Sequence, residues 1–218
     1  MRAGNLDVFR TLNPDNRWRP MLHQIMSGVR IGLVRHFEVR RGMPSGWRTA
    51  AEIHQWRQEY DGSEIVPQEV ALGDTAWRHC LSSDLPRAYL TAQSIFAGPV
   101  TQIPHLREVE IEPFDTGRFR LPVLAWRWLV QAAWLTSHRS QRAAKERFLA
   151  NVRHVAREIL HPRTEHTLVV SHGVMMMFLR RELLALGNSG PRFKLAEHGK
   201  LYVFERPTSS SQQKRSQE

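Results

Sequence analysis

Two histidines follow directly after apolar runs that have the length of buried strands. Arg35-His36 follows residues 29–34, and Ser171-His172-Gly173 follows residues 167–170. A neutral imidazole, whose ordinary pKa is about 6.5, can attack phosphorus and later act as a leaving group. Arginine keeps its charge at any working pH and presents a planar fork that matches phosphate oxygens. These residue types therefore indicate chemistry on a phosphate group.

Two further segments add a second arginine and a carboxylate. A strand candidate at residues 77–81 is followed by Ser83-Asp84 and, one helical turn later, by Arg87. A short apolar run at residues 100–103 precedes Glu108, whose carboxyl could supply a proton to a departing alkoxide. Glu110 and Glu112 lie close by and remain alternative proton donors.

The elements that must position these side chains alternate between strand and helix patterns. Strands are expected at residues 29–34, 77–81, 100–103, 167–170 and 200–204, and helices at 49–60, 84–97, 121–136, 141–160 and 173–187. Asp84 or a neighbouring serine should cap the second helix, and Gly98 should end it. This alternation predicts an α/β fold, a three-layer α/β/α sandwich with a mostly parallel central sheet. Ligands of such sheets bind beyond the carboxyl ends of the strands, where the polar side chains lie.

Four fragments together resemble the histidine phosphatase superfamily, which includes cofactor-dependent phosphoglycerate mutase. The resemblance covers residues 29–204 and keeps the order of the family's motifs. The fragments are Leu33-Val34-Arg35-His36, Ser82-Ser83-Asp84-Leu85-Pro86-Arg87-Ala88 with Thr91-Ala92, Leu106-Arg107-Glu108, and Val169-Val170-Ser171-His172-Gly173.

The resemblance implies a phosphoglycerate mutase-like fold and a role for each residue. His36 would attack phosphorus and become phosphorylated, while Arg35, Arg87 and His172 would hold the phosphoryl oxygens. Glu108 would protonate the leaving group and then help water to attack the phosphohistidine. The implied substrate is a small phosphorylated molecule, and no metal or other cofactor is implied.

The residues after the first histidine depart from the family pattern. Phe37 stands where the family usually has glycine, so its ring could narrow the mouth of the pocket or form a stacking wall. The family's assisting Asn and Thr residues have no clear match, and Arg40 or Arg41 could take over part of their work.

Bulk properties predict one catalytic domain, residues 28–206, between an N-terminal extension at 1–27 and a disordered tail at 207–218. The longest apolar stretch, residues 121–135, contains Arg127 and is shorter than the roughly 20 residues that cross a bilayer. No apolar run follows Arg2 and Arg10, so we expect no secretory signal. The single Cys80 suits a reducing compartment, so we expect a cytoplasmic protein.

The net charge of +10 is concentrated in residues 116–163, where nine Arg and one Lys face two Glu. A solvated basic helix face is the simpler interpretation, and a site for nucleic acid or anionic membrane is the alternative. The leading hypothesis is a phosphate monoesterase. Its rivals are a phosphoglycerate mutase-like phosphoryl transfer and a non-catalytic basic binding module, which the presence of both histidines, both arginines and Glu108 disfavours. The histidines show no spacing typical of a metal site.

Several apolar residues invite functional interpretations, but packing is the simpler one. The Met-rich stretch 175–177 is expected in the core, and Cys80 is expected to be inert. Trp126, Trp128 and Trp134 are expected to pack a variable lid onto the domain. The sharper alternative is that they form an apolar wall selecting an aromatic or lipid-like leaving group.

Overall fold

The computed structural model describes residues 28–109, 117–161 and 165–205, so the predicted N-terminal extension and tail lie outside the described residues. A five-stranded sheet has the order β4-β3-β6-β1-β7. Its strands are β1 (Arg30–Arg35), β3 (His79–Ser82), β4 (Val100–Gln102), β6 (Thr167–Ser171) and β7 (Leu201–Glu205). Four of them are parallel, and β7 runs antiparallel to β1 along one edge.

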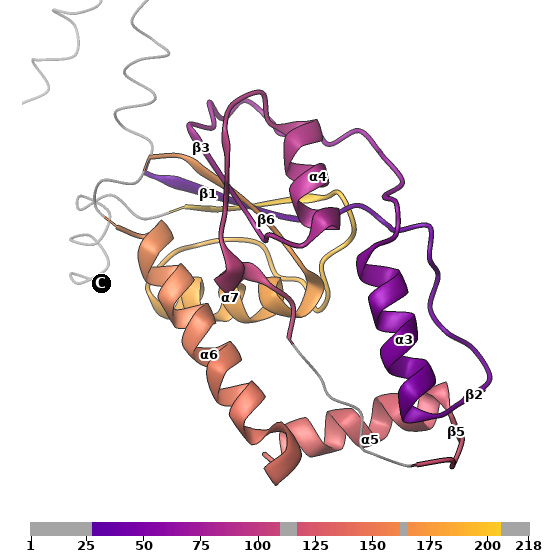
Figure 1. The fold of residues 1–218 in the computed structure, drawn as a ribbon. Helices are drawn as coiled ribbons and strands as arrows, with labels where there is room; N and C mark the ends of the chain where they lie inside the picture. The colour runs from indigo at the N-terminus through magenta and orange to yellow at the C-terminus, as the bar shows by residue number, and fades with distance from the viewer. Residues whose placement is uncertain (1–27, 110–116, 162–164, 206–218) are drawn as a thin grey trace, which may run out of the picture.

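Helices cover both faces of this sheet (Figure 1). The helix α4 (Pro86–Ile95) lies on one face, whereas α6 (Arg139–Ile159) and α7 (Gly173–Ala185) lie on the other. The predicted three-layer α/β/α sandwich with a mostly parallel sheet is therefore confirmed.

The alternation of side chains along β1 explains why both faces are covered. Ile31 and Leu33 belong to the apolar core beneath α6 and α7, whereas Val34 belongs to the core beneath α4. Burial on both faces requires a continuous apolar strand rather than an alternating one. Only glycine fits at position 32, because a Cβ there would lie 2.6 Å from the Trp77 ring, which packs on the sheet.

The predicted helix α6 buries its apolar face as expected. Phe148, Val152, Val155 and Ile159 recur at helical spacing, and all four are buried. Met175 and Met176 of α7 are fully buried in the same core, which confirms the packing interpretation of the Met-rich stretch.

The ends of α4 differ from the sequence prediction. Leu85 is the N-cap and makes no side-chain capping bond, although the Ser83 hydroxyl accepts a hydrogen bond from the Leu85 N–H at 3.3 Å. Asp84 does not cap the helix, because its carboxylate pairs with Arg107. The helix ends at Ile95 with Phe96 as the C-cap, before Gly98 is reached.

A peripheral group of elements extends away from the sheet at the bottom of Figure 1. It contains α3 (Ala50–Asp61), α5 (Val123–Leu135) and a two-stranded ribbon of β2 (Trp47–Arg48) and β5 (Leu121–Pro122). The ribbon was not predicted, because two-residue strands leave no periodic signal. Trp126 of α5 is buried and donates from Nε1 to the carbonyl of Arg48, which joins α5 to the ribbon. Within the described residues, no helix combines the length and apolar character needed to cross a membrane.

Candidate active site

The two predicted histidines meet at the carboxyl edge of the sheet. β1 and β6 are parallel neighbours with Arg35 in register with Ser171, so the next residue of each strand leaves at the same place. The ring centroids of His36 and His172 lie 5.1 Å apart. Neighbouring parallel strands therefore bring together two imidazoles that are more than 130 residues apart in the sequence.

His36 is held in one tautomer by the backbone. Its Nδ1 lies 2.6 Å from the Phe37 carbonyl oxygen, which can only accept, so Nδ1 carries the proton and Nε2 carries the lone pair. The side chain is 3% exposed. Burial lowers the pKa of His36 to about 3, with the nearby charges of Arg87 and Arg35 acting in the same direction. The imidazole is therefore neutral at working pH.

His172 is fully buried in the same cluster. Its Nε2 lies 2.9 Å from the Ser83 hydroxyl, which follows β3. Burial, reinforced by His36 and the two arginines, lowers its pKa well below the ordinary value. In the free protein, the positive charge of this cluster therefore comes from the guanidinium groups, because desolvation favours the neutral form of both imidazoles.

The two arginines approach the histidines from different elements. Arg35 donates from Nη1 to the Ala196 carbonyl at 2.8 Å, and its guanidinium passes over Gly173, where a Cβ would lie 3.4 Å from Cζ. Burial lowers the pKa of Arg35. A guanidinium group nevertheless keeps its charge at working pH. Arg87, in the first turn of α4, donates from Nη1 to the Asp61 carboxylate at 2.5 Å and lies over the Tyr60 ring.

Three buried polar atoms of this cluster have no hydrogen-bond partner within the described part of the chain. They are Nε of Arg35, Nε of Arg87 and Nδ1 of His172. A buried polar atom without a partner destabilises the fold, because its lost hydration costs about 1–3 kcal/mol. An oxyanion placed among them would supply the missing acceptors.

The carboxylate of Glu108 lies against the N-terminal turn of α7. Its Oε1 accepts from the Val109 and Met175 N–H groups, and its Oε2 accepts from the Val174 N–H, at 3.1–3.2 Å. Burial raises the pKa of its carboxyl above the ordinary value, although these backbone donors oppose the shift. The alternatives Glu110 and Glu112 lie outside the described residues.

A third imidazole, His198, was missed by the sequence analysis. Its ring centroid lies 5.1 Å from that of His36, and its Nδ1 lies 2.7 Å from the His36 carbonyl oxygen. His198 precedes β7, which is antiparallel, so the start of β7 lies at the edge where the parallel strands end. The signal was available, since a polar residue before an antiparallel edge strand reaches the same edge as one after a parallel strand.

Two expectations about the segment after His36 are not met. The Phe37 ring is fully buried, so it does not line a pocket mouth, and its N–H donates to the Thr91 hydroxyl at 2.9 Å. Arg40 and Arg41 pair at the surface with Glu64 and Glu59, respectively, and not with the histidine cluster.

Other residues singled out in the sequence serve mainly in packing. Trp126 is buried, Trp134 packs edge-on against Phe148, and Trp128 is 72% exposed, so the three do not form one enclosed apolar wall. Burial raises the pKa of the Cys80 thiol to about 12, consistent with an inert side chain. Across the described ranges, no group of three or more His, Cys, Asp or Glu side chains is arranged to hold a metal ion.

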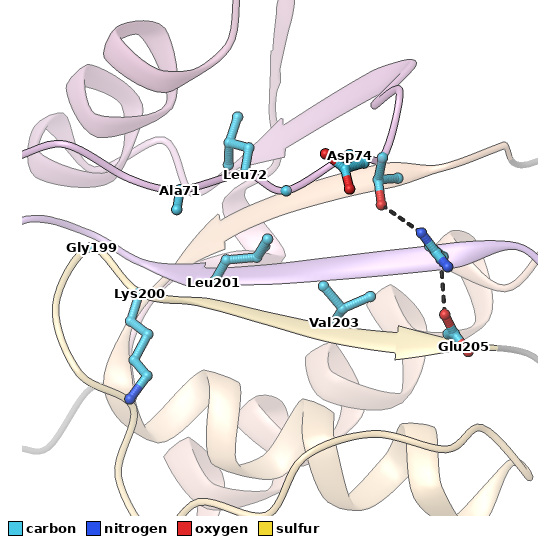
Figure 2. Close-up of a pocket in the computed structure, with 11 residues that line it drawn as sticks. Ala71, Leu72, Asp74, Gly199, Lys200, Leu201, Val203 and Glu205 are labelled. Carbon is cyan, nitrogen blue, oxygen red and sulfur yellow. Dashed lines mark hydrogen bonds and ion pairs between the residues drawn. The ribbon is translucent and has the colours of Figure 1, made fainter. Parts of the chain in front are cut away.

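A cavity of about 600 Å³ lies apart from the histidine cluster (Figure 2). It lies between residues 71–75 and the outer strand β7, and Arg30 bridges Thr75 and Glu205 at one end. None of the predicted site residues lines it. The charged and nucleophilic groups therefore single out the histidine cluster, not this cavity, as the candidate active site.

A model of the histidine phosphatase superfamily (branch 1) matches residues 69–217, more than half of the chain. The chain belongs to the histidine phosphatase superfamily. The matched span includes Arg87, Glu108 and His172 but begins after His36, which the fold brings to the same edge of the sheet. Membership supports a phosphatase or phosphotransfer function.

Solved structures of similar fold were also found. A candidate alpha-ribazole-5′-P phosphatase from Escherichia coli has 20% identity and a TM-score of 0.51, covering 80% of this chain and 89% of that one. The alpha-ribazole phosphatase from Shigella flexneri has 20% identity and a TM-score of 0.46, with 82% and 95% coverage. At this identity the first likeness supports the fold alone. Comparison with curated protein sequences found no match.

Proposed function

We propose that this protein hydrolyses a phosphate monoester through a phosphohistidine formed on His36, within a catalytic domain of residues 28–206. The observation that carries the proposal is the set of three unpaired buried polar atoms on Arg35, Arg87 and His172 beside the neutral His36 ring. Together they would supply hydrogen-bond donors to an oxyanion next to the nucleophile.

In the first step, the Nε2 lone pair of His36 forms a bond to phosphorus as the bond to the ester oxygen breaks. The Nδ1–H bond to the Phe37 carbonyl keeps the ring oriented as it becomes positively charged. Arg35, Arg87 and His172 hold the three non-bridging oxygens and stabilise the charge that spreads over them. Entry of a phosphate dianion also favours protonation of His172, which becomes a better donor when substrate is bound, while His36 stays neutral for the attack.

Glu108 is proposed to protonate the leaving alkoxide. Burial raises the pKa of the Glu108 carboxyl, which favours the protonated form that a general acid requires. Oε2 accepts one backbone hydrogen bond and Oε1 accepts two, so Oε2 is the oxygen with room for the proton. The resulting carboxylate then accepts a proton from the water that attacks the phosphohistidine, which releases phosphate and restores His36.

The phosphoryl group is proposed to enter between Arg35 and Glu108. Both of these side chains are half-buried, whereas His36, His172 and Arg87 are buried. Substrate must therefore displace part of the cover over the histidines. The Arg35 hydrogen bond to the Ala196 carbonyl is partly buried, and it is the bond that entry would exchange for one to a phosphate oxygen.

The test is turnover of an aryl phosphate by the purified chain and by His36→Ala. We expect phosphate release by the wild type, no release by the variant, and acid-labile phosphate on the wild-type protein after rapid quenching. EDTA should have little effect on the rate. Isomerisation of a phosphorylated sugar acid without phosphate release would favour the mutase alternative. Full activity in His36→Ala would refute the proposal.

A further inference from the structure

The outer face of α5 carries apolar side chains where a helix on a globular protein normally carries polar ones. Leu124, Trp128 and Leu135 lie four and seven residues apart, which places them on one face. They are 66%, 72% and 69% exposed. The buried side of the same helix contains Trp126 and Ala133. This helix is therefore apolar on both sides, and packing within the domain explains only one of them.

The exposed apolar surface continues beyond α5 onto the neighbouring ribbon. Met43 and Trp47 line a hollow of about 380 Å³ together with Leu124 and Arg127. Trp47 is 63% exposed, and Phe119, just before β5, is 80% exposed. We call these residues, with Leu124, Trp128 and Leu135, the α5 outer surface. Contiguous exposed apolar surface of this kind marks a binding site for a protein or a membrane.

The charge around this surface narrows the choice of partner. Residues 117–135, which include α5 and β5, contain three Arg and no Asp or Glu. Arg120 pairs with Glu52, while Arg118 and Arg127 are exposed at the edge of the apolar side chains. Surfaces that insert into the interfacial region of anionic membranes typically carry tryptophan and leucine beside arginine.

The same positive charge disfavours a second copy of the chain and either chain end as the partner of this surface. Two copies facing each other through the α5 outer surface would bring their unpaired arginines together. Neither chain end offers the complementary charge: residues 1–27 contain four Arg against two Asp, and residues 206–218 contain three basic residues against one Glu. Nucleic acid would use the arginines but leave the apolar stripe exposed to water.

We propose that the α5 outer surface docks the protein onto an anionic phospholipid membrane, lying on it without crossing it. Leu124, Trp128 and Trp47 would enter the interfacial region, while Arg118 and Arg127 would face the lipid headgroups. Anchoring of this kind needs both contributions, because a small apolar surface or a few charges alone give weak and reversible binding. This inference does not depend on the proposed catalytic activity.

The experiment is co-sedimentation of the full chain with vesicles of phosphatidylcholine alone or mixed with phosphatidylglycerol. Binding is expected only to the mixed vesicles. Trp128→Ser and Leu124→Ser should each weaken it about tenfold, because each removes one inserted side chain. Leu186→Ser, which alters an exposed leucine after α7, is the matched control and should bind as the wild type does. Arg127→Gln should weaken binding more than Arg153→Gln, which changes an exposed arginine of α6.

Three results would overturn the proposal. The first is that the protein does not co-sediment with the mixed vesicles. The second is that Leu186→Ser and Trp128→Ser weaken vesicle binding equally. The third comes from analytical ultracentrifugation of the free protein. Self-association that Trp128→Ser abolishes would assign the α5 outer surface to a second copy of the chain.

Discussion

The neutral state of His36 has a measurable consequence for stability in acid. Its pKa is lowered from 6.5 to about 3, chiefly because the ring is buried. Above pH 6.5 the ring is neutral in both the folded and the unfolded chain, so titration of His36 takes nothing from the free energy of unfolding. Below pH 6.5 the unfolded chain takes up a proton that the folded chain does not. Stability is therefore lost as the pH falls from about 6.5 towards 3.

The size of the effect follows from the same two pKa values. Between pH 7 and pH 5 the linkage relation gives a loss of about 2 kcal/mol for His36 alone. His36→Asn removes the titrating ring while its amide N–H still donates to the Phe37 carbonyl. The variant should therefore lose about 2 kcal/mol less stability than the wild type over this pH range.

Urea unfolding of the wild type and of His36→Asn at pH 7 and pH 5 measures this difference. Only the change in the free energy of unfolding between the two pH values is compared. His172 is present in both proteins, and burial is the main cause of its lowered pKa, so most of its contribution to the pH dependence cancels. His54→Asn, at an exposed position of α3, controls for replacing a histidine as such. Equal losses in the wild type and in His36→Asn would refute the assignment of a buried neutral imidazole at position 36. A ring-carbon NMR titration of His36 near pH 6.5 would do the same.

Three further predictions concern the chemistry. Glu108→Gln should slow alkyl esters by about a hundredfold and aryl esters much less, since a good leaving group needs little protonation; equal slowing in steady-state assays would argue against an acid role. Arg87→Lys should raise KM at least about tenfold, because a single ammonium lacks the planar fork that can hold Asp61 and phosphate together; an unchanged KM would contradict this. His198→Ala should lower kcat by about tenfold through loss of its hydrogen bond to the His36 carbonyl, and His198→Asn should restore most of it because the amide also donates. A pH-rate profile that is the same in both His198 variants, without rescue by Asn, would leave only a packing role for this ring.

The fold was largely predictable from the order of local patterns. Apolar strands buried on both faces and helices with apolar faces follow from local residue spacing, and the predicted strands and helices correspond to those observed. The family resemblance rested on four short fragments, and family membership is confirmed. The β2–β5 ribbon and the start of α4 could not be predicted, because they depend on pairing and hydrogen bonds between distant segments.

Local sequence determined that Arg35-His36 and Ser171-His172 end two strands, and parallel pairing then places them at one edge of the sheet. Only the tertiary structure decided their electrostatic state. A pKa reflects the water removed and the charges brought near by every packed element, and here burial leaves both imidazoles neutral between two charged arginines. The pairing of Arg87 with Asp61 from α3, the burial of Phe37 and the contact of His198 with His36 have the same origin. Each depends on contacts between segments far apart in the chain, which local residue patterns do not specify.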